Sequence, residues 1–307
     1  MSKRPHHSKA AQAANAAPSV HEQLGLAPGQ SVELLKALHI LTREGKLNQD
    51  SRRKLKQVNH LLQFIEPLLD KVLAASGTVT LADHGAGKSY LGFMLYDRFF
   101  AQRNGDQGVG HVYGIETRTE LVERSRELAR ELGFARMSFL PLSVLAATTS
   151  TELPPRIDVV TALHACDTAT DDAIAFGLAK QARHLVLVPC CQAEVAAALR
   201  KHKALSGARS PLSEMWRHPL HAREFGSQIT NVLRCLQLEA HGYDVTVTEL
   251  VGWEHSMKNE LILARRLQPA RPAQQARARE RLQAILDELG LQPLAARFAL
   301  PAEPPAG

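Results

Sequence analysis

The chain has 307 residues, of which 45% are hydrophobic and 22% charged, with a formal net charge of +6. This composition predicts a globular protein of one large domain, or of one domain with an accessory lobe, and its basic character is compatible with a nucleic-acid partner. No stretch resembles an apolar membrane span, and four cysteines, two of them adjacent, do not form a disulfide framework. We therefore expect a soluble cytoplasmic protein without membrane contact.

The first 76 residues predict an arm and a helical cap. Residues 1–28 are rich in Ala, Ser and Lys without an apolar period, which indicates a disordered basic arm. Residues 29–76 place apolar side chains three and four apart in two stretches, one starting at Ser31 and running to Asn48, the other starting at Asp50. We expect two amphipathic helices there. The second begins with a cationic cluster that is either a solvated face or a nucleic-acid contact: Arg52, Arg53, Lys54 and Lys56.

From Gly77 onward the pattern alternates between buried-type strands and amphipathic helices. We expect strands at 78–85, 111–116, 137–143, 156–165 and 184–191, and helices at 88–102, 118–133 and 170–180. Two further strands, 243–251 and 261–267, are joined by a loop too short for a helical crossover, so they should pair antiparallel. The predicted fold is α/β: a Rossmann-like, doubly wound, mostly parallel seven-stranded sheet with an antiparallel last strand, spanning 77–267. Residues 268–307 should form a C-terminal helix, either docked or tethered at the surface, and a Pro-rich tail.

The first strand ends in a glycine-rich loop, "LADHGAGKSYL", that carries GKS. A phosphate-binding loop needs another glycine where Ala82 stands, and a dinucleotide loop needs one at Tyr90. Asp83 would also repel a polyphosphate. A carboxylate beside a glycine turn instead suits a ligand with a cationic end, such as the ammonium and sulfonium of S-adenosylmethionine (SAM).

A second carboxylate, Glu116, ends the second strand in "VYGIET". At this place in nucleotide-binding sheets an acidic residue accepts hydrogen bonds from a ribose diol. Together, Asp83, Gly85, Gly87 and Glu116 predict a SAM site. The alternative, a strand-end Glu that caps the next helix, does not explain why a carboxylate also stands at Asp83.

These stretches resemble motif I and the acidic motif of class I SAM-dependent methyltransferases. "RKLKQVNHLLQF", "ALHACDTATDDAI" and "VPCCQ" are further similar to a branch that includes the tRNA 2′-O-methyltransferases, with an H-x-C-x-x-A-T-D segment, here His164 to Asp171, and a Cys-Cys pair, here Cys190 and Cys191. The resemblance covers roughly residues 50–267 and implies methyl transfer from SAM. The chain lacks that branch's Cys/His zinc-finger module and has "LHACD" where its tRNA enzymes tend to have Lys and Gly, so a tRNA ribose acceptor does not carry over.

The ends of the fourth and fifth strands should select the acceptor. His164 or Asp171 would act as general base towards a hydroxyl, whereas Cys166, with Cys190, suits the nucleophile of a pyrimidine C5 methyltransferase. Asp167 would contact the amino-acid part of SAM or its adenine edge. The structural alternatives are cysteines buried as small hydrophobes, a His164 bonded to backbone, and aspartates that cap a helix. A zinc site of His164 and the cysteines matches no standard spacing, so we expect no metal.

Two basic stretches are the candidate substrate contacts. Between the fifth and sixth strands lies a segment without a clear core pattern, in which Arg217, Arg223 and Trp216 suit phosphate contact and base stacking, or a lid over SAM. Lys258 and Asn259, in "WEHSMKNE", would border the acceptor or simply form a polar turn. We expect methyl transfer to RNA (tRNA or rRNA), with no obligate protein partner. The alternatives are a small-molecule or protein acceptor, and a non-catalytic RNA-binding protein.

Overall fold

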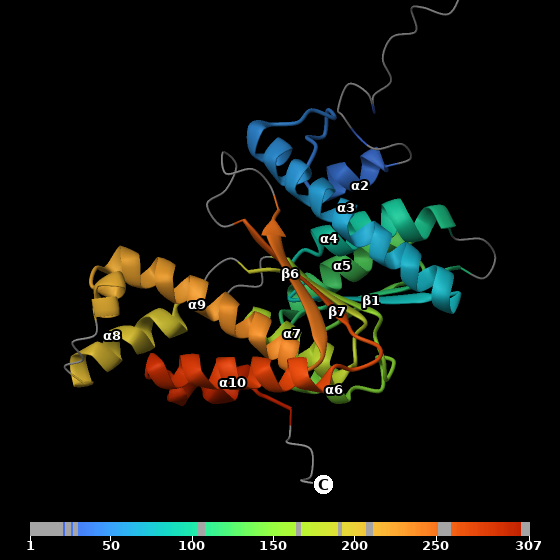
Figure 1. Cartoon of the computed structure of the whole chain (residues 1–307). Coiled ribbons are helices and arrows are strands. Elements are labelled where there is room, and N and C mark those ends of the chain that lie inside the picture. The colour runs from blue at the N-terminus through green and yellow to red at the C-terminus, as the bar shows by residue number, and fades with distance from the viewer. Residues whose placement is uncertain are drawn as a thin grey trace, which may run out of the picture.

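A computed structural model describes residues 21, 26, 30–103, 108–163, 167–189, 192–206, 211–250 and 259–301. Seven strands form one sheet in the order β3-β2-β1-β4-β5-β7-β6, with helices on both of its faces (Figure 1). The strands are β1 Val79–His84, β2 Gly110–Ile115, β3 Met137–Leu140, β4 Val159–Leu163, β5 His184–Val188, β6 Tyr243–Glu249 and β7 Glu260–Arg266.

The strand order creates a switch point beside β1. This strand pairs in parallel with β2 on one side and with β4 on the other. Strand β7 runs antiparallel to both β5 and β6. The predicted fold class is therefore confirmed. In open α/β sheets ligands bind outside the carboxyl ends of the strands at such a switch point, which here is the end of β1.

The helices cover the two faces unevenly. One face packs against α3 Gln49–Ser76, α4 Tyr90–Leu95 and α5 Thr119–Glu131, and the other against α6 Val144–Thr149 and α7 Ala169–Ala179. After α4 the chain continues through a π-helical turn, Tyr96–Phe100, and a 3₁₀ turn, Ala101–Arg103. Side chains of β1 point alternately to the two faces of the sheet, so that Val79 and Leu81 belong to the first core and Ala82 to the second.

The N-terminal cap differs in part from the prediction. Helix α2 is only Val32–Ala37, whereas the sequence predicted a helix from Ser31 to Asn48. The chain turns at His39, whose φ of 55° is left-handed, and the N–H groups of Ile40 and Leu41 donate back to the carbonyl of Leu35. This turn buries Ile40 and Leu41 in the core without further helix. Helix α3 follows the prediction, starting at the cap Asn48 and ending at left-handed Gly77.

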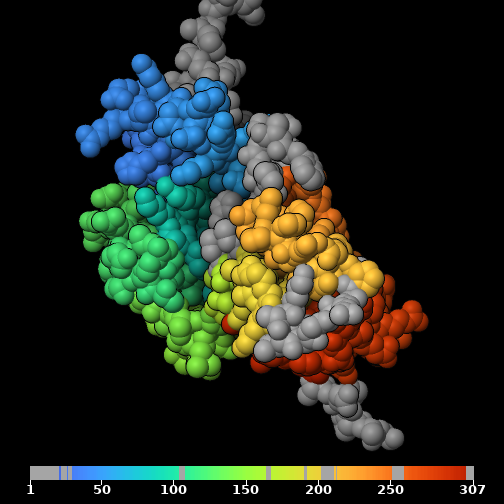
Figure 2. Space-filling model, turned by 90° about the vertical axis from the view of Figure 1, so that its left-hand side faces the viewer, coloured from blue at the N-terminus to red at the C-terminus, as the bar shows by residue number. Residues whose placement is uncertain are grey.

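A third layer contains the segment that was expected to lack a core pattern. It is helical: α8 Glu194–Ser206, the 3₁₀ helix η3 Pro211–Trp216 and α9 Pro219–Ala240. These helices pack with the C-terminal α10 Pro272–Glu288 and η4 Gln292–Phe298 around a separate apolar cluster. Figure 2 shows this layer, yellow to red, grouped on one side of the molecule, with the blue cap above the green helices.

The C-terminal helix is docked rather than tethered at the surface. Ala278, Leu282 and Leu286 are buried against the third cluster, and Arg297 pairs with Glu194 of α8 at 3.2 Å. The predicted arm 1–28 and the tail after Pro301 lie almost entirely outside the described residues. Across the described part of the chain, every helix is too short or too polar to span a bilayer.

Candidate functional site

Asp83, the penultimate residue of β1, is 2% exposed and lies beneath the glycine loop. Its carboxylate accepts the hydroxyl of Thr161 in β4 at 2.9 Å, the hydroxyl of Ser89 at 3.3 Å and the backbone N–H of Gly92. Burial raises the pKa of Asp83 to about 6, although these hydrogen bonds oppose the rise. The sequence placed this carboxylate at the mouth of the loop. The structure places it under the loop, where it holds β1, β4 and the start of α4 together.

The loop after β1 needs residues that tolerate unusual backbone angles and close approach. Gly85, Gly87 and Ser89 have φ values of 65°, 56° and 50°. Gly92 is required for a different reason: a Cβ there would lie 2.5 Å from the Ser89 hydroxyl and 3.4 Å from the Asp83 carboxylate. Because Gly92 has no side chain, the first turn of α4 can press against Asp83 and fix the loop.

Glu116 follows β2 and joins the two strand ends. Its carboxylate accepts the backbone N–H of Gly87 at 2.8 Å and two guanidinium N–H groups of Arg118, at 3.0 and 3.2 Å. Burial alone would raise its pKa, but the hydrogen bonds from Arg118 and from Gly87 outweigh it and lower the pKa to about 2. Glu116 is therefore ionised at neutral pH and directly attached to the glycine loop.

Arg118 lies over this junction. Its side chain is 59% exposed, and its Nη2 is 3.7 Å from the point that a Cβ on Gly87 would occupy. The guanidinium thus sits beside the loop and covers the Glu116 oxygens from the solvent side. A ligand hydroxyl that is to reach Glu116 has to take the place of one of these N–H donors.

His84, between Asp83 and the first glycine of the loop, points to the opposite face of β1. The ring is 6% exposed, contacts Phe176 of α7 with ring centres 5.7 Å apart, and has no hydrogen-bond partner on either nitrogen. Burial lowers its pKa to about 4. His84 is therefore neutral at pH 7 and packs as part of the core that supports the loop.

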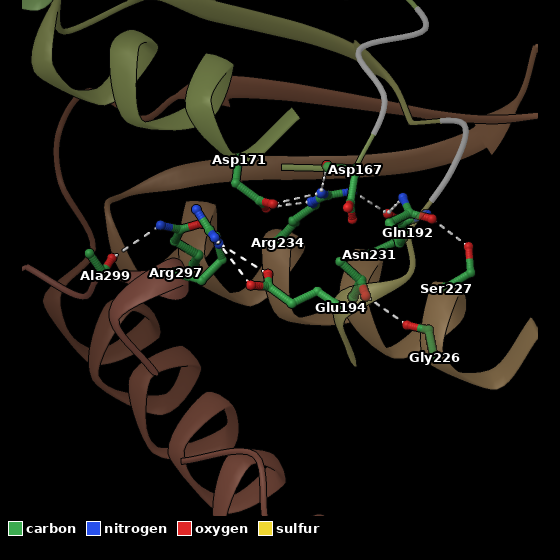
Figure 3. A network of polar contacts seen from close by, with 12 residues as sticks. Asp167, Asp171, Gln192, Glu194, Gly226, Ser227, Asn231, Arg234, Arg297 and Ala299 are labelled. Atoms are coloured by element: carbon green, nitrogen blue, oxygen red, sulfur yellow. Dashed lines mark hydrogen bonds and ion pairs between the residues drawn. The ribbon is translucent and has the colours of Figure 1, made fainter. Parts of the chain in front are cut away.

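Asp167 and Asp171 lie in a polar network after β4, in which Asp171 is buried and Asp167 half-buried (Figure 3). Both carboxylate oxygens of Asp171 accept N–H groups of Arg234 in α9, at 2.7 and 2.9 Å, and neither side chain is open to solvent. Asp167 has a left-handed φ of 51° and accepts the N–H of Ala193 at 3.2 Å. A general-base role for Asp171 would require that this ion pair break, so the geometry favours a positioning role.

The other predicted site residues divide into two groups. One group lies outside the described residues: His164, Cys166, Cys190, Cys191 and Lys258. The nucleophile and zinc hypotheses, and the general-base hypothesis for His164, therefore concern residues that the structure does not describe. Within the described part, no group of three side chains suited to bind a metal ion occurs.

The remaining predicted substrate contacts are described, and both arginines among them are paired with glutamates. Arg217 pairs with Glu214 at 3.1 Å and Arg223 with Glu224 at 3.0 Å, all on the surface of the third layer. Asn259 is buried and its carbonyl accepts the N–H of Leu250 at 2.7 Å.

Trp216 requires a correction. The sequence predicted base stacking for it, but the ring is 8% exposed and stacks on Phe225 within the third apolar cluster. A buried indole cannot offer its face to a nucleobase, so Trp216 is a core residue.

Sequence reasoning missed the partners of the two carboxylates. Thr161, Ser89, Gly92 and Arg118 were not singled out, nor was Arg234. A signal existed for Thr161, since neighbouring parallel strands of equal burial would place it opposite Asp83, as the observed register does. For Arg234 no signal existed, because α9 was not recognised as a helix.

Residues 53–198 match a family model described as a methyltransferase domain. The comparison with curated proteins gave no match.

Similar solved structures include magnesium protoporphyrin IX methyltransferase from Synechocystis PCC 6803 with bound SAH (17% identity, 78% of this chain and 96% of that chain, TM-score 0.42). An rRNA methylase from Streptococcus thermophilus is also similar (9% identity, 62% and 88%, TM-score 0.38). So is TrmK from M. capricolum in complex with SAH (10% identity, 66% and 68%, TM-score 0.35). Likenesses at this level do not identify the acceptor of this chain.

Proposed function

On the premise that residues 53–198 form a methyltransferase domain, we propose that this chain transfers a methyl group from SAM to RNA. The observation that carries the cofactor assignment is the cofactor junction, by which we mean Asp83, Gly87 and Glu116 at the switch point beside β1. Glu116 accepts the Gly87 N–H at 2.8 Å, while Asp83 lies beneath the same loop. One loop is thus bordered by two carboxylates, which suits a ligand with a diol and a cationic end.

The residues at the junction fit SAM in charge and in hydrogen bonding. Glu116 is ionised, and its two oxygens can accept both hydroxyls of a ribose in place of the exposed Arg118 guanidinium. Asp83, with a pKa of about 6, carries a negative charge at neutral pH that favours a cationic ligand over a polyphosphate. Asp83 acts through the loop that it holds, because its own oxygens are already engaged by Thr161 and Ser89.

When bound, SAM supplies a methyl group on a sulfonium, which is a good leaving group. The protein then has to hold the acceptor atom in line with that methyl group and to exclude water. For a hydroxyl acceptor a base must also take the proton. In the proposal His164 has this role, as the sequence predicted, because Asp171 is engaged by Arg234.

RNA as the acceptor is supported by charge and by the sequence resemblance. The chain carries a net charge of +6, and Arg52, Arg53 and Lys54 are exposed at the start of α3. Lys54 lies over the ring of Tyr90, the first residue of α4, with its Nζ 5.7 Å from the ring centre. A cationic surface that adjoins the cofactor loop is suited to hold a phosphate backbone near the transferred methyl group.

The proposal is tested by transfer of labelled methyl from SAM into total RNA from a strain that lacks this gene. RNA from the parent strain, already methylated, is the control substrate. Glu116→Gln should abolish labelling, whereas Glu123→Gln, an exposed glutamate of α5 away from the loop, should not. The expected result is label in the deletion-strain RNA only. Label in neither RNA, with SAM binding intact, would assign the acceptor to small molecules or proteins instead.

A further inference from the structure

Helix α9 carries a row of polar side chains on the face that is turned towards the sheet. Ser227, Asn231 and Arg234 are spaced four and three residues apart, so they lie along one side of the helix. Asn231 is 5% exposed and Arg234 is fully buried. A helix that packs on a sheet normally offers apolar residues there, and buried polar groups are costly unless every one finds a partner.

The row is hydrogen-bonded to loops at the carboxyl ends of β4 and β5 (Figure 3). Arg234 donates to the carbonyl of Asp167 at 2.9 Å, in addition to its ion pair with Asp171. Asn231 accepts the side-chain amide of Gln192 at 3.0 Å, and Ser227 donates to the other side of the same amide. The two loops are also joined directly, by the bond from the Ala193 N–H to Asp167.

The same row reaches the strand that closes the sheet. The side-chain N–H of Asn231 donates to Glu260, the first residue of β7, at 2.7 Å, while its oxygen also accepts from Arg234 at 3.1 Å. The Asn231 oxygen thus accepts two hydrogen bonds while one of its N–H groups donates a third. A shift of any of the three attached segments would leave a buried donor or acceptor unpaired, which is costly in a buried site.

Each attachment point directly follows a residue that the sequence analysis singled out. Asp167 follows Cys166, Gln192 follows Cys191, and Glu260 follows Asn259. The network therefore joins three points of the chain that are far apart in the sequence, at Asp167, Gln192 and Glu260. The network does not include Asp83, Gly87 or Glu116. It does include Asp167, for which the sequence predicted a contact to SAM, but the Asp167 carboxylate accepts the Ala193 N–H and its carbonyl accepts Arg234.

We infer that Asn231 and Arg234 are positioning residues, which hold the chain at Asp167, Gln192 and Glu260 in register for methyl transfer. The inference rests on the proposed function for its catalytic part. A misplacement of about 1 Å can reduce a rate about a hundredfold, because the acceptor atom must lie in line with the methyl group. Loss of Asn231 should therefore act on turnover rather than on SAM binding.

The first variant is Asn231→Leu, which replaces the amide by an apolar side chain of similar size. Its matched control is Thr230→Val, because Thr230 is the neighbouring residue, is also buried, and donates its hydroxyl only to Gly226 of its own helix. We expect Asn231→Leu to lower kcat roughly tenfold to a hundredfold. The Kd for SAM should stay within about twofold of the wild-type value, and Thr230→Val should resemble the wild type in both.

A second pair of variants keeps the test valid if the leucine variant does not fold. Asn231→Asp places a carboxylate against Glu260 and should lower kcat, whereas Asn231→Asp combined with Glu260→Gln restores a donor and an acceptor between the same two positions. Glu260→Gln alone should resemble the wild type, because the amide oxygen of Gln still accepts the Asn231 N–H. Recovery of kcat in the double variant relative to Asn231→Asp supports the positioning role. Equal kcat in all these variants and the wild type would overturn it.

Amide hydrogen exchange separates this inference from the proposed function, since it needs no acceptor. Exchange of the Ala193 N–H, held by Asp167, should be faster in Asn231→Leu than in Thr230→Val. If the wild type methylates no RNA, the proposed function fails, and the exchange at Ala193 still decides whether Asn231 holds the loops. Unchanged exchange would contradict the inference even if RNA methylation is confirmed.

Discussion

Replacing Asp83 by asparagine removes a buried negative charge while keeping the shape of the side chain. In the wild type, burial raises the pKa of Asp83 from its usual 3.8 to about 6. The folded protein thus binds a proton at Asp83 that the unfolded chain has already released between pH 4 and pH 6. Stability linked to Asp83 is present below about pH 4, is lost as the pH rises to about 6, and stays constant above that value.

The size of this effect follows from the pKa difference. A difference of about two pKa units corresponds to about 3 kcal/mol of unfavourable free energy at neutral pH. The side-chain carbonyl of the new asparagine would still accept the Thr161 hydroxyl, but its amide N–H groups would face the Gly92 N–H, a mismatch that costs about 1 kcal/mol. We therefore expect Asp83→Asn to be about 2 kcal/mol more stable than the wild type at pH 7.5 and to differ little from it at pH 4.

Urea unfolding of both proteins at pH 4 and pH 7.5 measures this difference, and calorimetry with SAM measures the cofactor affinity. We expect the variant to gain stability at pH 7.5 and to lose at least about tenfold in SAM affinity, as is typical of a charge kept for function. A variant that is less stable than the wild type at pH 7.5, or whose advantage is larger at pH 4, would refute the reasoning.

Three further substitutions test the site and the core. Gly92→Ala should weaken SAM binding about tenfold, because its Cβ would displace the Ser89 hydroxyl from Asp83, although alanine favours the helix by about 1 kcal/mol. An unchanged Kd for SAM in calorimetry would contradict this. Arg118→Ala should tighten SAM binding up to about fivefold, since the exposed ion pair that competes for Glu116 contributes at most about 1 kcal/mol. Weaker binding would show that Arg118 itself contacts the ligand. Trp216→Ala should lower the free energy of unfolding, measured with urea, by about 3–5 kcal/mol and leave SAM binding by the folded protein intact. Loss of RNA binding at unchanged stability would restore the stacking hypothesis.

The sheet could be predicted from the sequence because its strands are short apolar runs at regular intervals. The order of β1, β4 and β5, and the antiparallel β6–β7 pair, follow from connection lengths and from the general topology of such sheets. The glycine loop and Glu116 could be found because each stands at the end of a strand, where parallel sheets place their ligands.

Helix α9 could not be predicted by the same reasoning, because its sheet-facing side carries Ser227, Asn231 and Arg234 instead of apolar residues. Its apolar residues, such as Leu233 and Leu236, face the third cluster with α10, which no local pattern reveals. Helix α2 was predicted too long for the opposite reason: Ile40 and Leu41 continue the apolar spacing, but they reach the core through a turn at His39. In both cases a tertiary contact overrides the periodicity.

The most direct test of the central claim is calorimetric titration of SAM into the wild type and into Glu116→Gln. We expect a measurable heat of binding for the wild type. The affinity of the variant for SAM should be at least about tenfold lower, because hydrogen bonds between the ribose and an ionised carboxylate are lost. No heat with the wild type, or equal affinity in both proteins, would contradict the assignment of the loop after β1 and of Glu116 as the SAM site.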